Sequence, residues 1–159
     1  GDPKAKTVSA ETFSKLGSPI CDYVYKDSWA HEPIHDGIYD VEEGVTGIIR
    51  TEGPTINLQG AWAQNIGPYE MFIDFLGTKG GARLQYRKEF TLYSTKNGML
   101  TETVFNNATY PPFQKEIDEF VRSIEEGEKL VSHIDTHIIT AQMMDAIYRS
   151  AEEHREIVL

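Results

Sequence analysis

The sequence predicts an α+β fold: an open, largely antiparallel sheet with two C-terminal helices packed on one of its faces. In the first two thirds of the chain, apolar and polar residues alternate between glycine- and asparagine-containing turns, which is typical of antiparallel strands. In the last third, apolar residues recur three and four positions apart, which is typical of amphipathic helices. Strands followed by helices favour an α+β architecture, in which the second sheet face meets solvent or a partner.

The first strands are expected at residues 6–14 and 45–50, where β-branched and aromatic residues are separated by polar ones. The second strand ends in the turn 51–54, which contains Gly53 and Pro54. Residues 56–62 then alternate and contain Gly60, which predicts a half-buried strand.

Four further strands are expected in the middle of the chain, at residues 69–76, 82–86, 89–95 and 99–105. The glycine-rich residues 77–81 separate the first two of them as a tight turn. Asn97-Gly98 separates the last two, and this dipeptide between β-rich runs is a strong hairpin signal.

The first helix is expected from Pro112 to Gly127, with proline at its start and glycine after its end. Its apolar face is formed by Phe113, Ile117, Phe120, Val121 and Ile124. A second helix is expected to begin with Asp135 or Thr136 as N-cap and to end in the charged run 152–155. Residues 157–159 are apolar and predict a last short strand.

Length and charge limit the classes of function. A chain of 159 residues fits one domain, 1–159, with a core of its own. The net charge of −10 argues against a nucleic-acid binder and against an anionic membrane surface. No apolar stretch reaches the length of a transmembrane helix, and no signal peptide is visible. Cys21 is the single cysteine, so a reducing compartment, the cytoplasm, is expected.

Residues 31–35 match the zinc-protease pattern H-E-x-x-H, with His31 and His35 as its histidines. That chemistry needs both histidines on one helical face, and Pro33 inside the motif disfavours the helix. The sequence therefore favours a loop with two histidines, and a metal hydrolase is the weakest reading. His133 and His137, with Asp135 between them, are read as solvated or capping side chains.

Three other patterns carry no active site by themselves. The turn 77–81 lacks the order of a phosphate-binding loop, and a strand follows it. Glu42 and Glu43 are neighbours and are expected to point to opposite faces of a strand, so they cannot act together as acid and base. Cys21 lacks a defined catalytic geometry with the histidines, although a thiol nucleophile is conceivable. The sequence therefore predicts no catalytic residue and no metal site.

Several segments, in their order and spacing, resemble the C-terminal domain of the Gfo/Idh/MocA oxidoreductases, the family of glucose–fructose oxidoreductase and inositol dehydrogenase. They are residues 39–43 (Tyr-Asp-Val-Glu-Glu), 44–50 (Gly-Val-Thr-Gly-Ile-Ile-Arg), 61–63 (Ala-Trp-Ala), 76–82 (Leu-Gly-Thr-Lys-Gly-Gly-Ala) and 145–152 (Asp-Ala-Ile-Tyr-Arg-Ser-Ala-Glu). Phe120, Val121, Ile124 and Gly127 fit the penultimate helix of that domain. The resemblance runs from Asp2 to Leu159.

The resemblance implies a two-domain enzyme that acts on a sugar or polyol. An N-terminal Rossmann domain binds NAD or NADP and carries a Glu-Lys-Pro motif, and an Asp and a His lie on the helix before the C-terminal domain. This chain has no Glu-Lys-Pro, and residues 1–5 resemble the turn after that helix, so no catalytic residue is carried over. The dinucleotide is expected to bind the separate Rossmann domain and not this chain.

The resemblance gives this chain two expected roles. It forms one wall of the substrate pocket, and its open sheet face assembles homo-oligomers. The candidate substrate-binding residues are Trp29, His31, His35 and Trp62, because aromatic rings and imidazoles suit sugar faces and hydroxyl groups. The alternative is a stand-alone, non-enzymatic module that uses the same sheet to assemble or to bind a partner.

Overall fold

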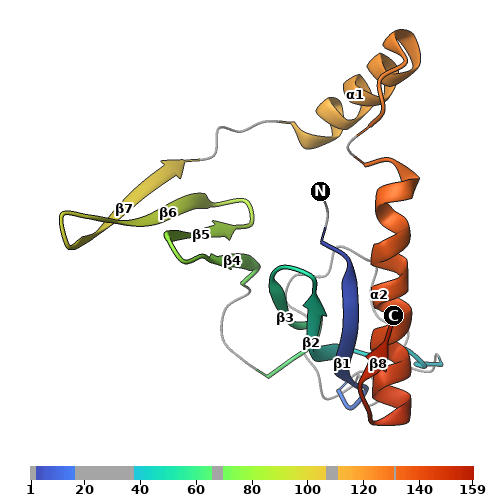
Figure 1. Ribbon diagram of the computed structural model, residues 1–159. Helices are drawn as coiled ribbons and strands as arrows, with labels where there is room; N and C mark the ends of the chain where they lie inside the picture. Colours follow the sequence, from blue (N-terminus) through green and yellow to red (C-terminus); the bar gives the residue numbers. More distant parts are fainter. Residues whose placement is uncertain (1–2, 17–37, 66–69, 107–110, 131) are drawn as a thin grey trace. The chain divides into compact units, whose positions relative to one another are not determined.

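A computed structural model describes residues 3–16, 38–65, 70–106, 111–130 and 132–159. The described elements divide into two compact units, one built from residues 1–65 and 131–159 and the other from residues 66–130. Each unit contains one four-stranded sheet. Figure 1 shows the strands and helices of both units along the chain.

The first unit is a sheet with the strand order β3-β2-β1-β8 and one long helix, α2. Its strands are β1 (Ala5–Phe13), β2 (Gly44–Thr51), β3 (Thr55–Ala61) and β8 (Ile157–Val158), and α2 spans Ile134–Glu153. Every pair of neighbouring strands is antiparallel. Figure 1 shows α2 lying alongside β1 and β8.

The core of the first unit lies between the sheet and α2. Val8 pairs with Ile49 on one side and with Ile157 on the other, so the three side chains share a face of the sheet. Together with Ala10 they are buried against Ala146 of α2. Small residues in the next row, Ala10 paired with Gly47, allow the close approach of the strands.

Ser150 connects α2 to the edge of β1. Its Oγ accepts a hydrogen bond from Ala10 N at 2.9 Å and donates one to Arg155 O at 2.7 Å. The side chain is 2% exposed, so these bonds satisfy a buried hydroxyl group and two backbone groups. They fix α2 to β1 beyond the point where β8 ends.

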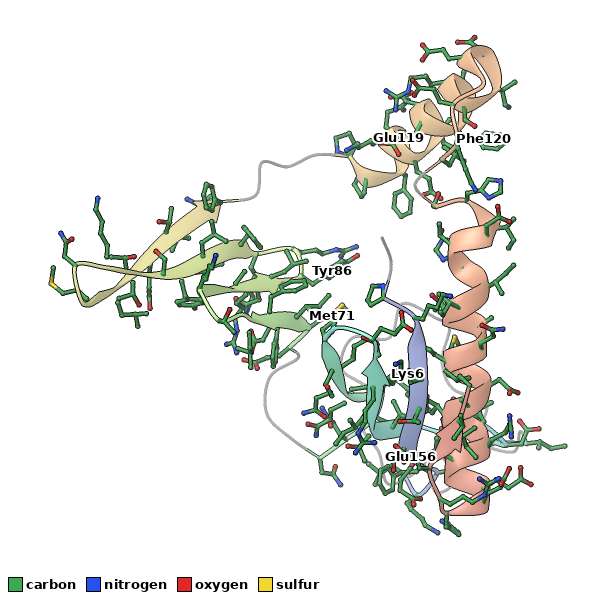
Figure 2. The ribbon with its side chains drawn as sticks, in the orientation of Figure 1. Lys6, Met71, Tyr86, Glu119, Phe120 and Glu156 are labelled. Carbon is green, nitrogen blue, oxygen red and sulfur yellow. The ribbon has the colours of Figure 1, made fainter. Side chains whose placement is uncertain are left out.

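The second unit contains an antiparallel meander, β4-β5-β6-β7, and the helix α1. Its strands are β4 (Phe72–Leu76), β5 (Gly80–Gln85), β6 (Glu89–Lys96) and β7 (Met99–Asn106). Asn97 and Gly98 both have positive φ, 52° and 74°, as the two-residue hairpin turn between β6 and β7 requires. Met71 and Tyr86, labelled in Figure 2, are joined where β4 begins and β5 ends, since Tyr86 N donates to Met71 O at 2.8 Å.

Helix α1 spans Pro112–Glu126, and the left-handed Gly127, with φ 69°, ends it. The side chains of its apolar face, among them Phe120 in Figure 2, stay between 44% and 76% exposed. No residue of α1 is buried by the described part of the chain. The helix and both of its end signals were predicted from the sequence.

The predicted α+β class and the antiparallel strand pairing are confirmed, with two differences. The strands form two four-stranded sheets where the sequence suggested one, and of the two helices α2 is the one packed on a sheet. The N-cap of α2 is His133, two residues before Asp135 and three before Thr136, the two predicted positions. Its Nδ1 accepts a hydrogen bond from Asp135 N at 3.2 Å. An imidazole acceptor thus replaces the expected carboxylate or hydroxyl cap.

Candidate functional site

The candidate site lies at one end of the β3-β2-β1-β8 sheet. Phe13 at the end of β1 pairs with Gly44 at the start of β2, and Gly44 pairs with Ala61 at the end of β3. The residues just before β2 and just after β3 therefore meet at this end of the sheet. They include Tyr39, Glu42, Glu43 and Trp62.

Glu43 is the buried centre of this end of the sheet. Its side chain is 4% exposed, and its Oε1 accepts hydrogen bonds from the backbone N–H groups of Lys15 and Leu16. Its Oε2 accepts one from the Tyr39 hydroxyl at 3.3 Å. Its backbone O also accepts from Trp62 N at 3.0 Å. Glu43 therefore connects three segments: the residues after β1, those before β2 and those after β3. Its role is structural.

Glu42 faces a different partner, because α2 brings Tyr148 against it. The Tyr148 hydroxyl donates to Glu42 Oε1 at 2.5 Å. This hydrogen bond lowers the pKa of the Glu42 carboxyl below its ordinary value of 4.5 and raises the pKa of Tyr148 above its ordinary value of 10.0. Glu42 is therefore a carboxylate at neutral pH, and Tyr148 holds it in place.

Tyr148→Phe is expected to raise the pKa of Glu42 towards 4.5, because the group that stabilises the charged form is removed. The depressed pKa also means that this bond stabilises the fold above about pH 4.5 and that its contribution is lost as the pH falls through the native pKa of Glu42. Carboxyl-detected NMR across an acid titration measures the pKa of Glu42 in the wild-type protein and in Tyr148→Phe. An unchanged pKa of Glu42 in the variant would contradict the assignment.

Trp62 completes the site with a large aromatic surface. Its indole N–H donates to Glu42 O at 2.9 Å, and its ring centroid lies 5.8 Å from that of Tyr39, at an interplanar angle of 53°. The side chain is 49% exposed. Tyr39, Glu42, Trp62 and Tyr148 are together called the Glu42 site below. It combines aromatic faces, which pack against sugar C–H groups, with a carboxylate that accepts hydrogen bonds from hydroxyl groups.

Of the four sequence-predicted binding residues, Trp62 belongs to this site. Trp29, His31 and His35 lie outside the described residues, as does Cys21. Leu16 and Tyr39, which flank residues 17–37 in the described chain, both bond to Glu43. Leu16 and Tyr39 therefore both lie beside the Glu42 site.

Sequence reasoning did not identify Tyr39, Glu42 or Tyr148 as site residues. Glu42 and Glu43 were excluded as an acid–base pair, and the structure agrees, since they bond to different partners. Glu42 and Tyr148 both fall within segments that carry the resemblance, residues 39–43 and 145–152. The hydrogen bond between them joins positions 106 residues apart, which only tertiary structure reveals.

The other patterns have structural roles. His133 caps α2 as described above, and no group of three or more potential metal ligands occurs among the residues the structure covers. Of the glycine-rich residues 77–81, residues 77–79 form the turn between β4 and β5, and Gly80 and Gly81 begin β5. Gly77 N donates to Gly80 O across this turn at 3.0 Å. The predicted hairpin turn is thus confirmed. No described helix is long and apolar enough to cross a membrane.

No protein-family model matches the sequence, and no curated protein matches it either. Solved structures of oxidoreductases are similar over nearly the whole chain. The aldose-aldose oxidoreductase from Caulobacter crescentus, solved with glycerol, has a TM-score of 0.71 at 17% identity over 99% of this chain. GenD2 from gentamicin A biosynthesis, solved with NAD, has a TM-score of 0.64 at 16% identity over the full length of this chain.

This chain covers 42% and 43% of those two proteins, less than half of each. At 17% and 16% identity, the structural similarity to these oxidoreductases establishes the fold of this chain. The fold expected from the sequence resemblance is therefore confirmed.

Proposed function

We propose that this chain is the C-terminal, substrate-binding and oligomer-forming domain of a Gfo/Idh/MocA-type oxidoreductase that acts on a sugar or polyol. The observation that carries the proposal is the match of nearly the whole chain to under half of two oxidoreductases. One of them was solved with glycerol, a small polyol. The sequence segments that resemble this family support the same assignment.

The Glu42 site forms the wall of the substrate pocket in this proposal. Trp62 packs against the sugar or polyol, and Glu42 accepts hydrogen bonds from its hydroxyl groups. Trp29, His31 and His35 are proposed to contribute to the same wall. The anchoring of Leu16 and Tyr39 at Glu43 supports this, because these residues flank the segment that carries all three.

NAD or NADP is proposed to bind outside this chain, on an N-terminal Rossmann domain, because the described residues do not fit a dinucleotide. A pyrophosphate site needs a glycine-rich turn between a strand and a helix N-terminus. Residues 77–81 join two strands, and the first turn of α2 carries the acidic Asp135. This chain is therefore proposed to position the substrate and to provide no catalytic residue. The cytoplasm, where NAD and NADP are available, is the proposed location.

Trp62→Ala in the full-length oxidoreductase is expected to raise the KM for the sugar or polyol about fivefold, since an aromatic contact contributes about 1 kcal/mol. The KM for NAD or NADP is expected to stay unchanged. Trp62→Phe is the matched control, because it keeps a ring and loses the indole N–H. Steady-state kinetics with both substrates varied measures the effect. A soluble Trp62→Ala variant whose KM for the sugar or polyol is unchanged would assign Trp62 to packing and would contradict a substrate contact.

The proposed oligomer forms through one face of the β4-β5-β6-β7 sheet. Residues that pair across the strands share a face, which gives the rows Ile73-Leu84-Phe90-Phe105 and Phe75-Ala82-Leu92. Ile73, Phe75, Leu92 and Phe105 are between 39% and 53% exposed. The opposite face carries the Asp74–Arg83 ion pair at 2.6 Å and the buried Thr91. A continuous apolar face of this kind commonly marks an interaction surface, and a second copy of the chain is the proposed partner.

Leu92→Glu is expected to convert the oligomer to a single 18.0 kDa species, because it places a carboxylate in the centre of the apolar face. Thr95→Glu is the matched control, since Thr95 is exposed on the opposite face of the same strand. Light scattering at micromolar concentration measures both. A wild-type protein that is itself a monomer at this concentration would overturn the proposed assembly.

A further inference from the structure

Asn97 is the one asparagine in the sequence that is followed by glycine. In an Asn-Gly pair the backbone nitrogen of the glycine can attack the side-chain amide carbon of the asparagine, because glycine has no Cβ atom to obstruct the approach. The product is a five-membered imide ring, which water then opens. The hairpin turn between β6 and β7 therefore contains a chemically reactive pair of residues.

The structure leaves both reacting groups of this pair accessible. Asn97 and Gly98 are exposed, and a Cβ atom added at Gly98 would meet no atom within 4 Å. Within the described part of the chain, no hydrogen bond outside the strand ladder uses the Asn97 side chain or the Gly98 N–H. No described contact therefore blocks the attacking nitrogen or the attacked amide.

The end of the β6–β7 hairpin is held by few interactions. β5 begins at Gly80, which pairs with Ser94, so in the described sheet residues 95–100 pair only with one another. Figure 1 shows this end of the hairpin extending past β5. All of residues 95–100 are exposed, and the hydroxyl groups of Ser94 and Thr101, 2.7 Å apart, form the side-chain bond that closes the base of this segment. Opening of residues 95–100 therefore costs little free energy.

This opening is required for the reaction, because the closed turn does not align the two groups. Asn97 and Gly98 have positive φ values of 52° and 74°, as a two-residue hairpin turn requires. The imide ring needs a rotation about the Cα–C bond of Asn97 that a turn of this type does not have. The rate of the reaction is therefore set by how often the hairpin end opens.

We propose that Asn97 is a site of spontaneous deamidation, at a rate controlled by the opening of residues 95–100. A bond forms between Gly98 N and the side-chain carbon of Asn97, and the bond from that carbon to the side-chain nitrogen breaks. This nitrogen leaves as ammonia, with the proton from Gly98 N. Water then opens the imide at either carbonyl, which gives aspartate or isoaspartate at position 97. Isoaspartate adds a carbon atom to the backbone of a two-residue turn, so the pairing of Lys96 with Met99 is lost.

Incubation of the protein in mildly alkaline buffer, followed by peptide mapping with mass spectrometry, tests the proposal. We expect the peptide that contains Asn97 to gain the mass difference between an amide and a carboxyl group. Asn57 is the matched control within the chain, since it is also exposed but lies in β3, pairs with Ile48 and is followed by Leu58. Asn57 should remain unchanged over the same time. A sample unfolded in guanidinium chloride is expected to react faster at Asn97 than the folded protein.

Thr101→Val is expected to increase the rate at Asn97 about threefold, because it removes the cross-strand hydroxyl bond to Ser94. Thr103→Val is the matched control on the same strand. Thr103 pairs with Leu92, so the variant removes no cross-strand bond between hydroxyl groups of the described residues. The rate at Asn97 should equal that of the wild-type protein in this control.

An intact Asn97 in the folded protein, at the time when the unfolded sample has reacted completely, would overturn the proposal. Equal rates in Thr101→Val and Thr103→Val would overturn the control of the reaction by hairpin opening. Modification of Asn57 as fast as that of Asn97 would also overturn the proposal, because neither the glycine nor the hairpin end would then select the site. The proposal is independent of the proposed function, which none of these outcomes changes.

Discussion

Replacing Glu43 with alanine is expected to lower the free energy of unfolding of the first unit by about 3 kcal/mol, since it removes charge-assisted hydrogen bonds at a buried position. The variant leaves the N–H groups of Lys15 and Leu16 and the hydroxyl of Tyr39 without this acceptor. It also removes the contact that holds the chain on both sides of residues 17–37. Urea unfolding followed by tryptophan fluorescence measures the loss, because both tryptophans precede residue 66.

Glu42→Ala is the control for Glu43→Ala, since it removes a carboxylate from the next residue. Among the residues that the structure describes, Glu42 has one side-chain partner, at the surface, so a loss below about 1 kcal/mol is expected. Glu43→Gln should fall between the two, because its amide oxygen can still accept from the backbone. Equal destabilisation by Glu42→Ala and Glu43→Ala would show that Glu43 does not organise this end of the sheet.

Gly47→Ala is expected to destabilise the first unit by about 2 kcal/mol, within the range of an overpacked core. A Cβ atom at position 47 would lie 2.7 Å from Ala10 Cβ, 3.0 Å from Ser9 O and 3.1 Å from Ala10 Cα. Two of these three atoms belong to the backbone of β1 and cannot rotate away. The paired strands β1 and β2 would have to separate under α2. A lower melting temperature, by about 2–4 °C for each kcal/mol, is the measurable result.

Gly60→Ala is the matched control on the neighbouring strand. A Cβ atom there would meet only Val45 Cγ1, at 3.9 Å, which is ordinary contact. Its φ is not among the positive values, so alanine fits the backbone. The expected change in stability is within about 0.5 kcal/mol, as for other surface sites. If Gly47→Ala is as well tolerated as Gly60→Ala, β1 and β2 do not pack as closely at Gly47 as the structure shows.

Local sequence signals predicted most of the secondary structure. The alternation of Ile56, Leu58 and their polar neighbours marked β3, and Asn97-Gly98 marked the β6–β7 hairpin, because both signals act within a few residues. Pro112 and Gly127 marked the ends of α1 for the same reason. The boundaries differ from the structure by a few residues at most.

Long-range features were not predictable in this way. Nothing in the local pattern assigns β4 and β1 to different sheets, because strand partners are chosen by tertiary packing. The cap of α2 at His133 was missed, since histidine is not among the residues that usually cap a helix. The Glu42–Tyr148 bond depends on the docking of α2 through Ala146 and Ser150. Of the candidate site, Trp62 was predicted from its chemistry, and its neighbours emerged only from the fold.

The central proposal is that this chain forms part of a longer, dinucleotide-dependent oxidoreductase. The most direct test is the intact mass of the protein that carries this sequence in its source cells, captured with an antibody against the 159-residue chain. The account predicts a protein of more than twice 18.0 kDa whose additional part binds NAD or NADP, as the coverage of the matched oxidoreductases implies. A single species of 18.0 kDa would contradict it and would favour the non-enzymatic assembly module.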